Sequence, residues 1–348
     1  MRLRFAPFLL TAFCMPLCGG AETPATGEPA APARPLEITP ATQKAIRKGL
    51  DWLARTQSSD GGWGDSGNND VALTAMAGLA FLANGSTPNR GPYADNVSRA
   101  ISFLLSRSDP TTGLIATTNG SLMHCHGYAM LFLGEVYGME ALPDHRERIR
   151  TVLQRAVKFS AASQTAAGGW YYDASTTTDD EGSTTITQIE GLRACRNVGL
   201  IVPIRTINRA LEYLRKSQNP DGSIRYKVSN PGQGSAALTA AGLMCFYSLG
   251  DYSSDNAKRA LKFLNQKAPN GSLERTGHFY YSHFYAAQAF YLAGEPYWGN
   301  YWRAASKMFL QTQSQDGMWV GDIAPPFDTA VACIILQIPY RYLPILQK

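Results

Sequence analysis

The side chains with the greatest capacity for chemistry stand in three short clusters. They are the acidic run Asp179–Asp180–Glu181, the tripeptide His124–Cys125–His126, and the looser pair Asp65 and Asp70. A carboxyl group can donate or accept a proton in a reaction, and two carboxyl groups on one rim of a cavity can act on polysaccharides. The three consecutive acids Asp179, Asp180 and Glu181 are therefore the candidate catalytic residues.

The two histidines of the tripeptide allow two interpretations. On a helix, His124 and His126 point roughly 200° apart around the axis and cannot share an ion. In an extended segment they face the same side, where they could hold a transition metal. Histidine pairs are more often structural. We therefore expect hydrogen-bonding groups at the rim of a cavity, and no metal site or cofactor.

The cysteines give no sign of a metal or redox site. Two of the six, Cys14 and Cys18, belong to the N-terminal segment described below, and no pair of the other four has C-x-x-C spacing. All four lie in apolar stretches predicted to be helical, so we expect buried thiols, although the sequence leaves a disulfide open. These four are Cys125, Cys195, Cys245 and Cys333.

Aromatic residues concentrate in one later stretch, which reads FYYSHFYAAQAFY at 279–291. Some of these rings must face the axis of any cavity that the stretch lines, and an aromatic wall suits a large apolar ligand or the face of a sugar. We expect that wall to include, with His124 and His126, a set of later residues: Tyr280, Tyr281, His283, Phe284 and Asp328.

The elements that position these residues follow from an internal repeat. Two of its copies read RKGLDWLARTQSSDGGWG at 47–64 and NRALEYLRKSQNPDGSIRY at 208–226. Each copy is an amphipathic helix that ends at a polar residue and a glycine turn. The turn glycines are Gly61, Gly113, Gly168, Gly222, Gly271 and Gly317, spaced by 46 to 55 residues.

A second, more apolar helix follows each turn, as in VALTAMAGLAFLANG from Val71. Six helix pairs of this kind can stack in an open superhelix or close into a ring. An open array needs polar capping repeats, yet the last copy ends in the apolar VACIILQIPYRYLPIL. The sequence therefore predicts an all-α (α/α)6 toroid, a barrel of six helical hairpins in a single domain, with the apolar helices inside.

The N-terminal segment has the pattern of a secretory signal. Arg2 and Arg4 precede a short apolar run over 5–17, and small residues at Gly19 and Ala21 offer a cleavage site. We expect a signal peptide over 1–21, a proline-rich disordered tether over 22–40 and the toroid domain over 41–348. This organisation predicts export to the periplasm or the extracellular space, with no transmembrane span.

Composition narrows the classes of function. Of 348 residues, 45% are hydrophobic and 17% are charged, and the formal charge of +5 is spread without a basic block. These values argue against a chain that is disordered throughout and against a dedicated nucleic-acid binder, which would carry a clustered basic face. They leave an enzyme, a carrier and a scaffold open, and they do not indicate an oligomeric state.

The segment KGLDWLARTQSSDGGW, Lys48 to Trp63, resembles the QW repeat of squalene–hopene and oxidosqualene cyclases, which occurs in degenerate form in protein prenyltransferase β subunits. The resemblance covers about 300 residues, and it implies this superfamily's toroid. In that motif the Gln amide ties the outer helix to the next inner helix, and the Trp stacks over the junction. The residues given this structural role are Gln57, Trp63, Gln164, Trp170, Gln218, Gln313 and Trp319.

The resemblance implies handling of an isoprenoid, but the catalytic motifs of the family are not intact. Class II cyclases protonate an alkene with the middle aspartate of D-x-D-D. Thr177 stands where the first aspartate belongs, and a second register, anchored on the preceding Gly-x-Trp, puts Ser183 in the place of the proton donor. No D-x-C occurs, so the zinc site of the prenyltransferases does not carry over.

Three hypotheses remain open on this basis. The first is a protein that binds an isoprenoid or another large apolar ligand in a central cavity; if it is an enzyme, it is a cyclase-like isomerase or a prenyltransferase-like transferase. The second is a non-catalytic toroid that binds a ligand or a protein. The third is a glycan-active enzyme, which needs two carboxyl groups within about 10 Å across the cavity.

Overall fold

Alternating amphipathic and apolar segments fold into two concentric layers of helices. The computed structural model describes residues 38–64, 70–116, 120–174, 176, 180–230, 232–269, 273 and 277–346, and the compact unit that contains them spans Glu37–Lys348. Within these ranges there are twelve α-helices and no β-strand, only isolated bridges. The predicted signal peptide and the tether up to residue 37 lie outside the described residues. Helix α1 begins at Pro40, the last residue of the predicted tether.

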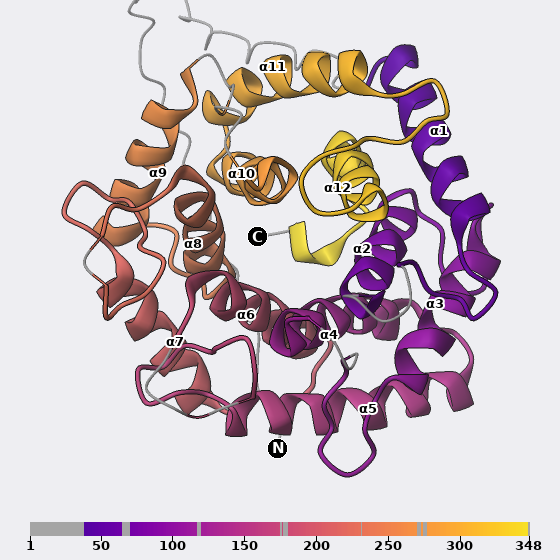
Figure 1. Cartoon of the computed structure of the whole chain (residues 1–348), viewed down its shortest axis with the longest axis horizontal. Coiled ribbons are helices and arrows are strands. Elements are labelled where there is room, and N and C mark those ends of the chain that lie inside the picture. Colours follow the sequence, from indigo (N-terminus) through magenta and orange to yellow (C-terminus); the bar gives the residue numbers. More distant parts are fainter. Residues whose placement is uncertain are drawn as a thin grey trace, which may run out of the picture. The chain divides into compact units, whose positions relative to one another are not determined.

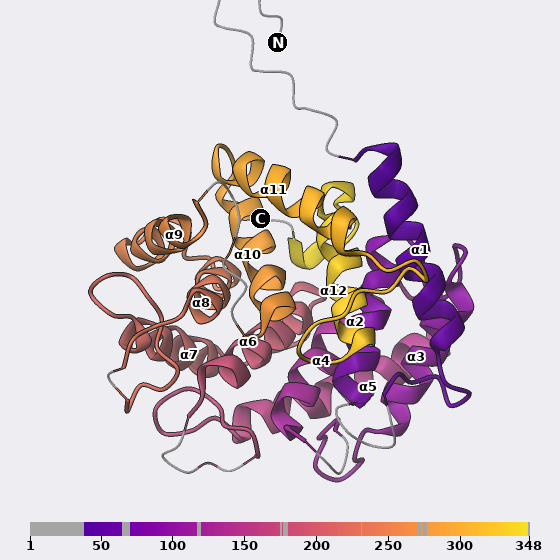
Figure 2. The same cartoon turned by 45° about the horizontal axis from the view of Figure 1, so that its top comes forward.

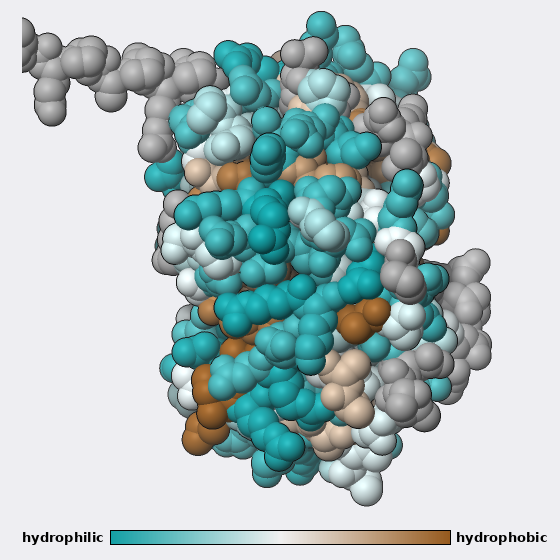
Figure 3. All heavy atoms as spheres, turned by 90° about the vertical axis from the view of Figure 1, so that its left-hand side faces the viewer, coloured by the Kyte–Doolittle hydropathy of each residue, from teal (hydrophilic) through white to brown (hydrophobic). Residues whose placement is uncertain are grey.

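The odd-numbered helices form the outer layer (Figure 1). Their buried residues recur three and four positions apart, as on a helix that covers a core with one face and meets water with the other. These helices are α1(Pro40–Thr56), α3(Ala94–Ser106), α5(Pro143–Ala162), α7(Ile204–Ser217), α9(Asp255–Lys267) and α11(Tyr297–Thr312). The surface over α7 and α9 is accordingly hydrophilic for the most part (Figure 3).

The even-numbered helices form the inner layer, and the outer helices surround them (Figure 2). They are buried on nearly every side; all fourteen residues of the first are buried. These helices are α2(Asp70–Ala83), α4(Leu122–Met139), α6(Gly182–Asn197), α8(Ala236–Ser248), α10(Phe279–Ala293) and α12(Pro325–Gln337).

The ring closes between the last repeat and the first. Helix α12 packs against α2 in the inner layer, and α1 packs against both α11 and α12. The chain therefore has the (α/α)6 toroid fold that the repeat predicts. The first copy of the repeat buries the apolar C-terminal copy, which would otherwise be exposed to solvent.

The turn glycines adopt the left-handed backbone that the sequence predicts. Five of them, all but Gly271, have φ between 86° and 103°, as Gly168 does at 98°. A Cβ on Gly168 would also collide with the carbonyl oxygen of Arg209 on the next outer helix, α7. Glycine therefore serves both the turn and the close approach of the following repeat. Gly271 lies outside the described residues.

Four glutamines fasten neighbouring repeats together. Gln164 Nε2 donates to Gly168 O over 2.8 Å and to Thr206 O, in the first turn of α7, over 3.0 Å. Three others make the same pair of bonds: Gln57, Gln218 and Gln313. The amide thus joins one outer helix to the next outer helix, not to an inner helix as we expected, because the glycine turn lets that next helix approach it.

Three tryptophans make the connection between the layers. Trp170 Nε1 donates to Ser160 O on α5, and the backbone N–H of Trp170 donates to Thr185 Oγ1 on α6 over 2.9 Å. Trp63 and Trp319 repeat both bonds with their own outer and inner helices. Each of the three is at most 2% exposed, so these hydrogen bonds satisfy groups that water cannot reach.

The C-terminal segment, η2(Ile338–Tyr340) and η3(Pro344–Leu346), covers the ring at the C-terminal ends of the inner helices (Figure 1). Arg193 near the end of α6 donates from Nη1 to Ile345 O over 3.0 Å and to Ser248 Oγ of α8. Among the residues that the structure describes, no helix is long and apolar enough to cross a membrane.

Candidate functional site

A cavity of about 490 Å³ opens among the N-terminal ends of the inner helices. Because all six inner helices begin at this end of the ring, the first turns of different repeats converge on one space. The lining residues are Ala72, Leu73, Ser121, His124, Tyr128, Tyr172, Ser183, Tyr226, Ser235, Ala237, Leu238, His278, Tyr281, Ile323 and Phe327.

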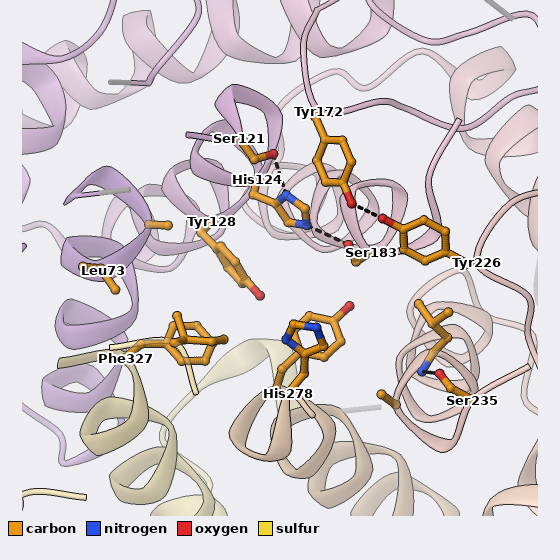
Figure 4. Close-up of a pocket in the computed structure, with 15 residues that line it drawn as sticks. Leu73, Ser121, His124, Tyr128, Tyr172, Ser183, Tyr226, Ser235, His278 and Phe327 are labelled. Atoms are coloured by element: carbon orange, nitrogen blue, oxygen red, sulfur yellow. Dashed lines mark hydrogen bonds between the residues drawn. The ribbon is translucent and has the colours of Figure 1, made fainter. Parts of the chain in front are cut away.

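One side of the cavity carries a chain of hydrogen bonds centred on His124 (Figure 4). Its Nδ1 lies 2.6 Å from Ser121 Oγ, and its Nε2 lies 3.0 Å from Ser183 Oγ. Ser121 is the residue before α4, and Ser183 stands in the first turn of α6. The imidazole therefore bridges two adjacent inner helices at the mouth of the ring.

Glu181, predicted as a catalytic acid, is the N-cap of α6. Its carboxylate accepts from the backbone N–H groups of Ser183 and Thr184 over 2.8 and 2.7 Å. It also accepts from the two hydroxyl groups of the same residues over 2.7 and 2.9 Å. Four donors on one fully buried carboxylate match the usual capping role, and they leave it behind Ser183 rather than in the cavity.

These bonds determine the proton positions along the chain. Ser183 has one hydroxyl proton and uses it in the hydrogen bond that it donates to Glu181. His124 must therefore donate from Nε2 to Ser183 Oγ, and its Nδ1 accepts from Ser121. Burial lowers the pKa of His124, and the charge of Glu181 opposes that shift only in part. The imidazole is therefore neutral, with its proton on Nε2.

Tyrosines form the remaining polar part of the lining. The hydroxyl groups of Tyr172 and Tyr226 bond to each other across the mouth (Figure 4). Tyr128 OH lies 3.5 Å from the hydroxyl of Tyr285. The hydroxyl of Tyr281 is buried, and among the described residues it has no hydrogen-bond partner. Tyr281 thus lines the cavity and carries a buried donor that no described residue satisfies.

His126, which we expected at the cavity, lies between α4 and the outer helix α5. Its Nδ1 accepts from the backbone N–H of Ile115 over 3.0 Å, and its Nε2 lies 3.1 Å from Ala156 O. It takes the place that threonines such as Thr74 hold in other repeats. Burial lowers its pKa to about 4. The two-residue offset from His124 turns the ring away from the cavity, as a helix requires.

Of the residues expected from the aromatic stretch, some face the cavity and others face the outer helices. Tyr281 lines the cavity, whereas the ring of Tyr280 packs near Phe309 of the outer layer. His283 also faces outward, and its Nδ1 forms a hydrogen bond with Tyr301 OH on α11 over 2.8 Å. Phe284 is buried beside Tyr285 and is not among the lining residues.

Asp328 was also expected to face the cavity. Its Oδ2 accepts from the backbone N–H of Gly321 over 2.8 Å, while Oδ1 is buried without a partner among the described residues. Burial raises its pKa to about 7. It is fully buried in the first turn of α12, beside the lining residue Phe327, and does not itself line the cavity.

The other expected acids do not gather at the cavity. Asp180 accepts from Tyr213 OH over 2.8 Å and from the backbone N–H of Val228. Asp70 lies 3.6 Å from Arg107 in an ion pair. Asp179 and Asp65 lie outside the described residues. The lining residues that the structure describes therefore include no carboxyl group.

In the described part of the chain, no group of three His, Cys, Asp or Glu side chains is placed to hold a metal ion. Cys125, Cys195, Cys245 and Cys333 are buried thiols that form no disulfide with one another. The cavity has an apolar wall and neutral hydrogen-bonding groups, and the buried carboxylate of Glu181 lies behind one of these groups, Ser183.

Several lining residues were missed by sequence reasoning, among them Ser121, Tyr172, Tyr226 and His278. One sequence signal could have found part of this set, because the residues just before each apolar helix must lie at the mouth of the ring. His278 is such a residue. In the structure its φ is 63°, which is uncommon for a residue other than glycine.

No family model matches this chain. In sequence, it is similar to the terpene cyclase–glycosyl transferase fusion protein fsoA of Humicola fuscoatra, with 26% identity over 179 residues. That match spans 51% of this chain and 11% of the fusion protein.

Two solved structures show the fold at low identity. One is a variant of the type II terpene cyclase MstE from Scytonema in complex with its substrate, geranylgeranyl dihydroxybenzoate. It has a TM-score of 0.62 and 14% identity, over 87% of this chain and 98% of that one. The other is a GH76 α-mannanase of Bacteroides thetaiotaomicron, with a TM-score of 0.63 and 10% identity over 85% and 94%. The chain therefore has a terpenoid cyclase-like α/α toroid fold, which glycan-active enzymes share.

Proposed function

We propose that this terpenoid cyclase-like toroid binds an apolar ligand of the isoprenoid class in the cavity at the N-terminal ends of its inner helices. The observation that carries the proposal is the lining itself. Leu73, Leu238, Ile323 and Phe327 supply aliphatic and aromatic walls, and the polar groups gather around His124. A cavity of this kind excludes water from a hydrocarbon chain and orients one polar end.

The proposal is for binding rather than for cyclisation started by a carboxylic acid. Ser183 occupies the place that the cyclase resemblance assigns to the proton donor, and an alkyl hydroxyl group cannot protonate an alkene at neutral pH. The neighbouring acid, Glu181, already accepts four hydrogen bonds. The proposal therefore keeps the ligand binding that the resemblance implies and leaves out the acid catalysis, because Glu181 serves as the N-cap of α6.

The similar proteins support the same class of ligand. The Scytonema cyclase was solved with a geranylgeranyl compound, which joins a long apolar chain to a polar ring. The glycan-active alternative has the mannanase as a fold relative. However, the described residues that line the cavity do not include the pair of carboxyl groups that glycoside hydrolysis requires.

Native mass spectrometry tests the proposal directly. The purified full chain is mixed with farnesol, and we expect a one-to-one complex. Ala237→Phe places a ring in the cavity and should abolish the complex, whereas Ser102→Phe, on the exposed face of α3, should retain it. Absence of the complex in the wild type, or equal binding by Ala237→Phe, would overturn the proposal.

We further propose that the chain is exported and loses residues 1–21, on the basis of the charged start, the short apolar run and the small residues before Glu22. Expression of the full chain in a Gram-negative bacterial host, followed by intact mass measurement of the periplasmic fraction, tests this. A mature protein that begins at Glu22 is expected. Full-length protein retained in the cytoplasm would contradict export.

A further inference from the structure

We infer that the ligand of this cavity carries an uncharged oxygen function, such as a hydroxyl, carbonyl or epoxide group, and that the hydroxyl group of Tyr281 binds that oxygen. The inference rests on the proposed function and names the chemical class within it. Its starting point is a buried donor for which the described residues supply no acceptor.

Tyr281 lines the cavity and is only 9% exposed. Its hydroxyl group has no hydrogen-bond partner among the described residues. Other buried tyrosines nearby do have partners, since Tyr285 meets Tyr128 and Tyr301 meets His283. A buried polar group without a partner destabilises a protein, so its retention in a cavity points to a partner supplied from outside.

The charge around the cavity favours a neutral ligand. Burial above all, with Tyr128 and the carboxylate of Glu181 nearby, raises the pKa of Tyr281 well above its ordinary value. The group therefore remains a proton donor. Glu181 lies 2.7 Å behind Ser183 Oγ, and none of the described lining residues is Lys or Arg. A diphosphate would meet a buried negative charge and no cationic side chain from this set.

The oxygen-bearing end of the ligand then lies toward α6 and α10, and its hydrocarbon part lies along the apolar wall. Tyr281 belongs to the first turn of α10, and Ser183 belongs to the first turn of α6. Phe327 and Leu73, which line the cavity on α12 and α2, supply hydrocarbon surface. The arrangement explains why one cavity combines an unused donor with a largely apolar lining.

The test compares three probes that share one skeleton: farnesol, farnesene and farnesyl diphosphate. Dissociation constants are measured by titration for the wild type and for Tyr281→Phe. We expect the wild type to bind farnesol most tightly. Loss of one hydrogen bond should weaken farnesol binding about 3- to 10-fold in the variant and leave farnesene binding unchanged.

Tyr280→Phe is the matched control, because Tyr280 is the adjacent residue on the same helix and packs toward the outer layer. It should bind all three probes as the wild type does. Thermal unfolding checks that Tyr281→Phe is folded; removal of an unpartnered hydroxyl group should not lower its melting temperature.

The outcomes separate this inference from the proposed function. If the probes bind but Tyr281→Phe binds farnesol like the wild type, or if the diphosphate binds most tightly, the inference is wrong and the proposed function stands. If the wild type binds none of the three, the proposed function itself fails.

Discussion

The Nε2 atom of His124 lies 3.0 Å from Oγ of Ser183, and through this contact α4 and α6 meet at the rim of the cavity. The contact gives each group a defined state. The hydroxyl group of Ser183 donates its hydrogen bond to Glu181, so the imidazole is the donor in the contact. A residue pair that resembles a nucleophile and its base is therefore oriented in the opposite sense, with the histidine N–H donating a hydrogen bond to the serine oxygen.

The state of His124 can be measured by ¹⁵N NMR. We expect the neutral tautomer with the proton on Nε2, and a titration midpoint below the ordinary value of 6.5, because burial disfavours the charged ring. A proton on Nδ1, or a midpoint above 6.5, would contradict the arrangement.

Glu181→Gln should destabilise the fold by about 1–2 kcal/mol, the usual range for loss of a helix cap. The amide has one accepting oxygen, while its NH₂ group would face donors that the carboxylate now satisfies. Urea denaturation measures the change, with the exposed Glu212→Gln on α7 as control.

Gln164→Ala should cost about 2–3 kcal/mol of unfolding free energy. The buried amide donates to two carbonyl groups, and truncation leaves both without this partner while removing a link between α5 and α7. Gln154→Ala, on the exposed face of α5, is the control and should change stability by less than about 0.5 kcal/mol. Equal stabilities of the two variants would show that the link between outer helices contributes little.

Stability should also depend on pH through Glu135. Burial raises the pKa of this carboxyl group from 4.5 to about 8, so the folded chain keeps a proton that the unfolded chain loses. The contribution of Glu135 to the unfolding free energy is therefore full below pH 4.5 and is lost as pH rises toward 8.

Denaturation at a series of pH values tests this, with Glu135→Gln and the exposed control Glu147→Gln. The wild type and Glu147→Gln should lose stability as pH rises from 4.5 to 8, and Glu135→Gln should lose less. Asp328, with a pKa raised to about 7, adds a loss of the same sign at lower pH. An unchanged slope in Glu135→Gln would show that another group is responsible.

The sequence by itself determined the repeat, the helix pairs and the turns, because each depends on contacts that recur at a short spacing. The turn needs a positive φ at Gly168, which favours glycine there. The apolar face of each amphipathic outer helix indicates the side that packs on the inner layer. Closure also followed from sequence, since the apolar last copy needed a partner.

Only the tertiary structure decided which side chains reach the cavity. An inner helix is apolar on every side, so its sequence carries no record of its rotation about its own axis, and a change of one residue turns a side chain by about 100°. That rotation separates Tyr281 from Tyr280 and His124 from His126. The tertiary structure also shows Glu181 as the N-cap of α6, because its carboxylate folds back onto the N-terminus of the helix that follows it in the chain.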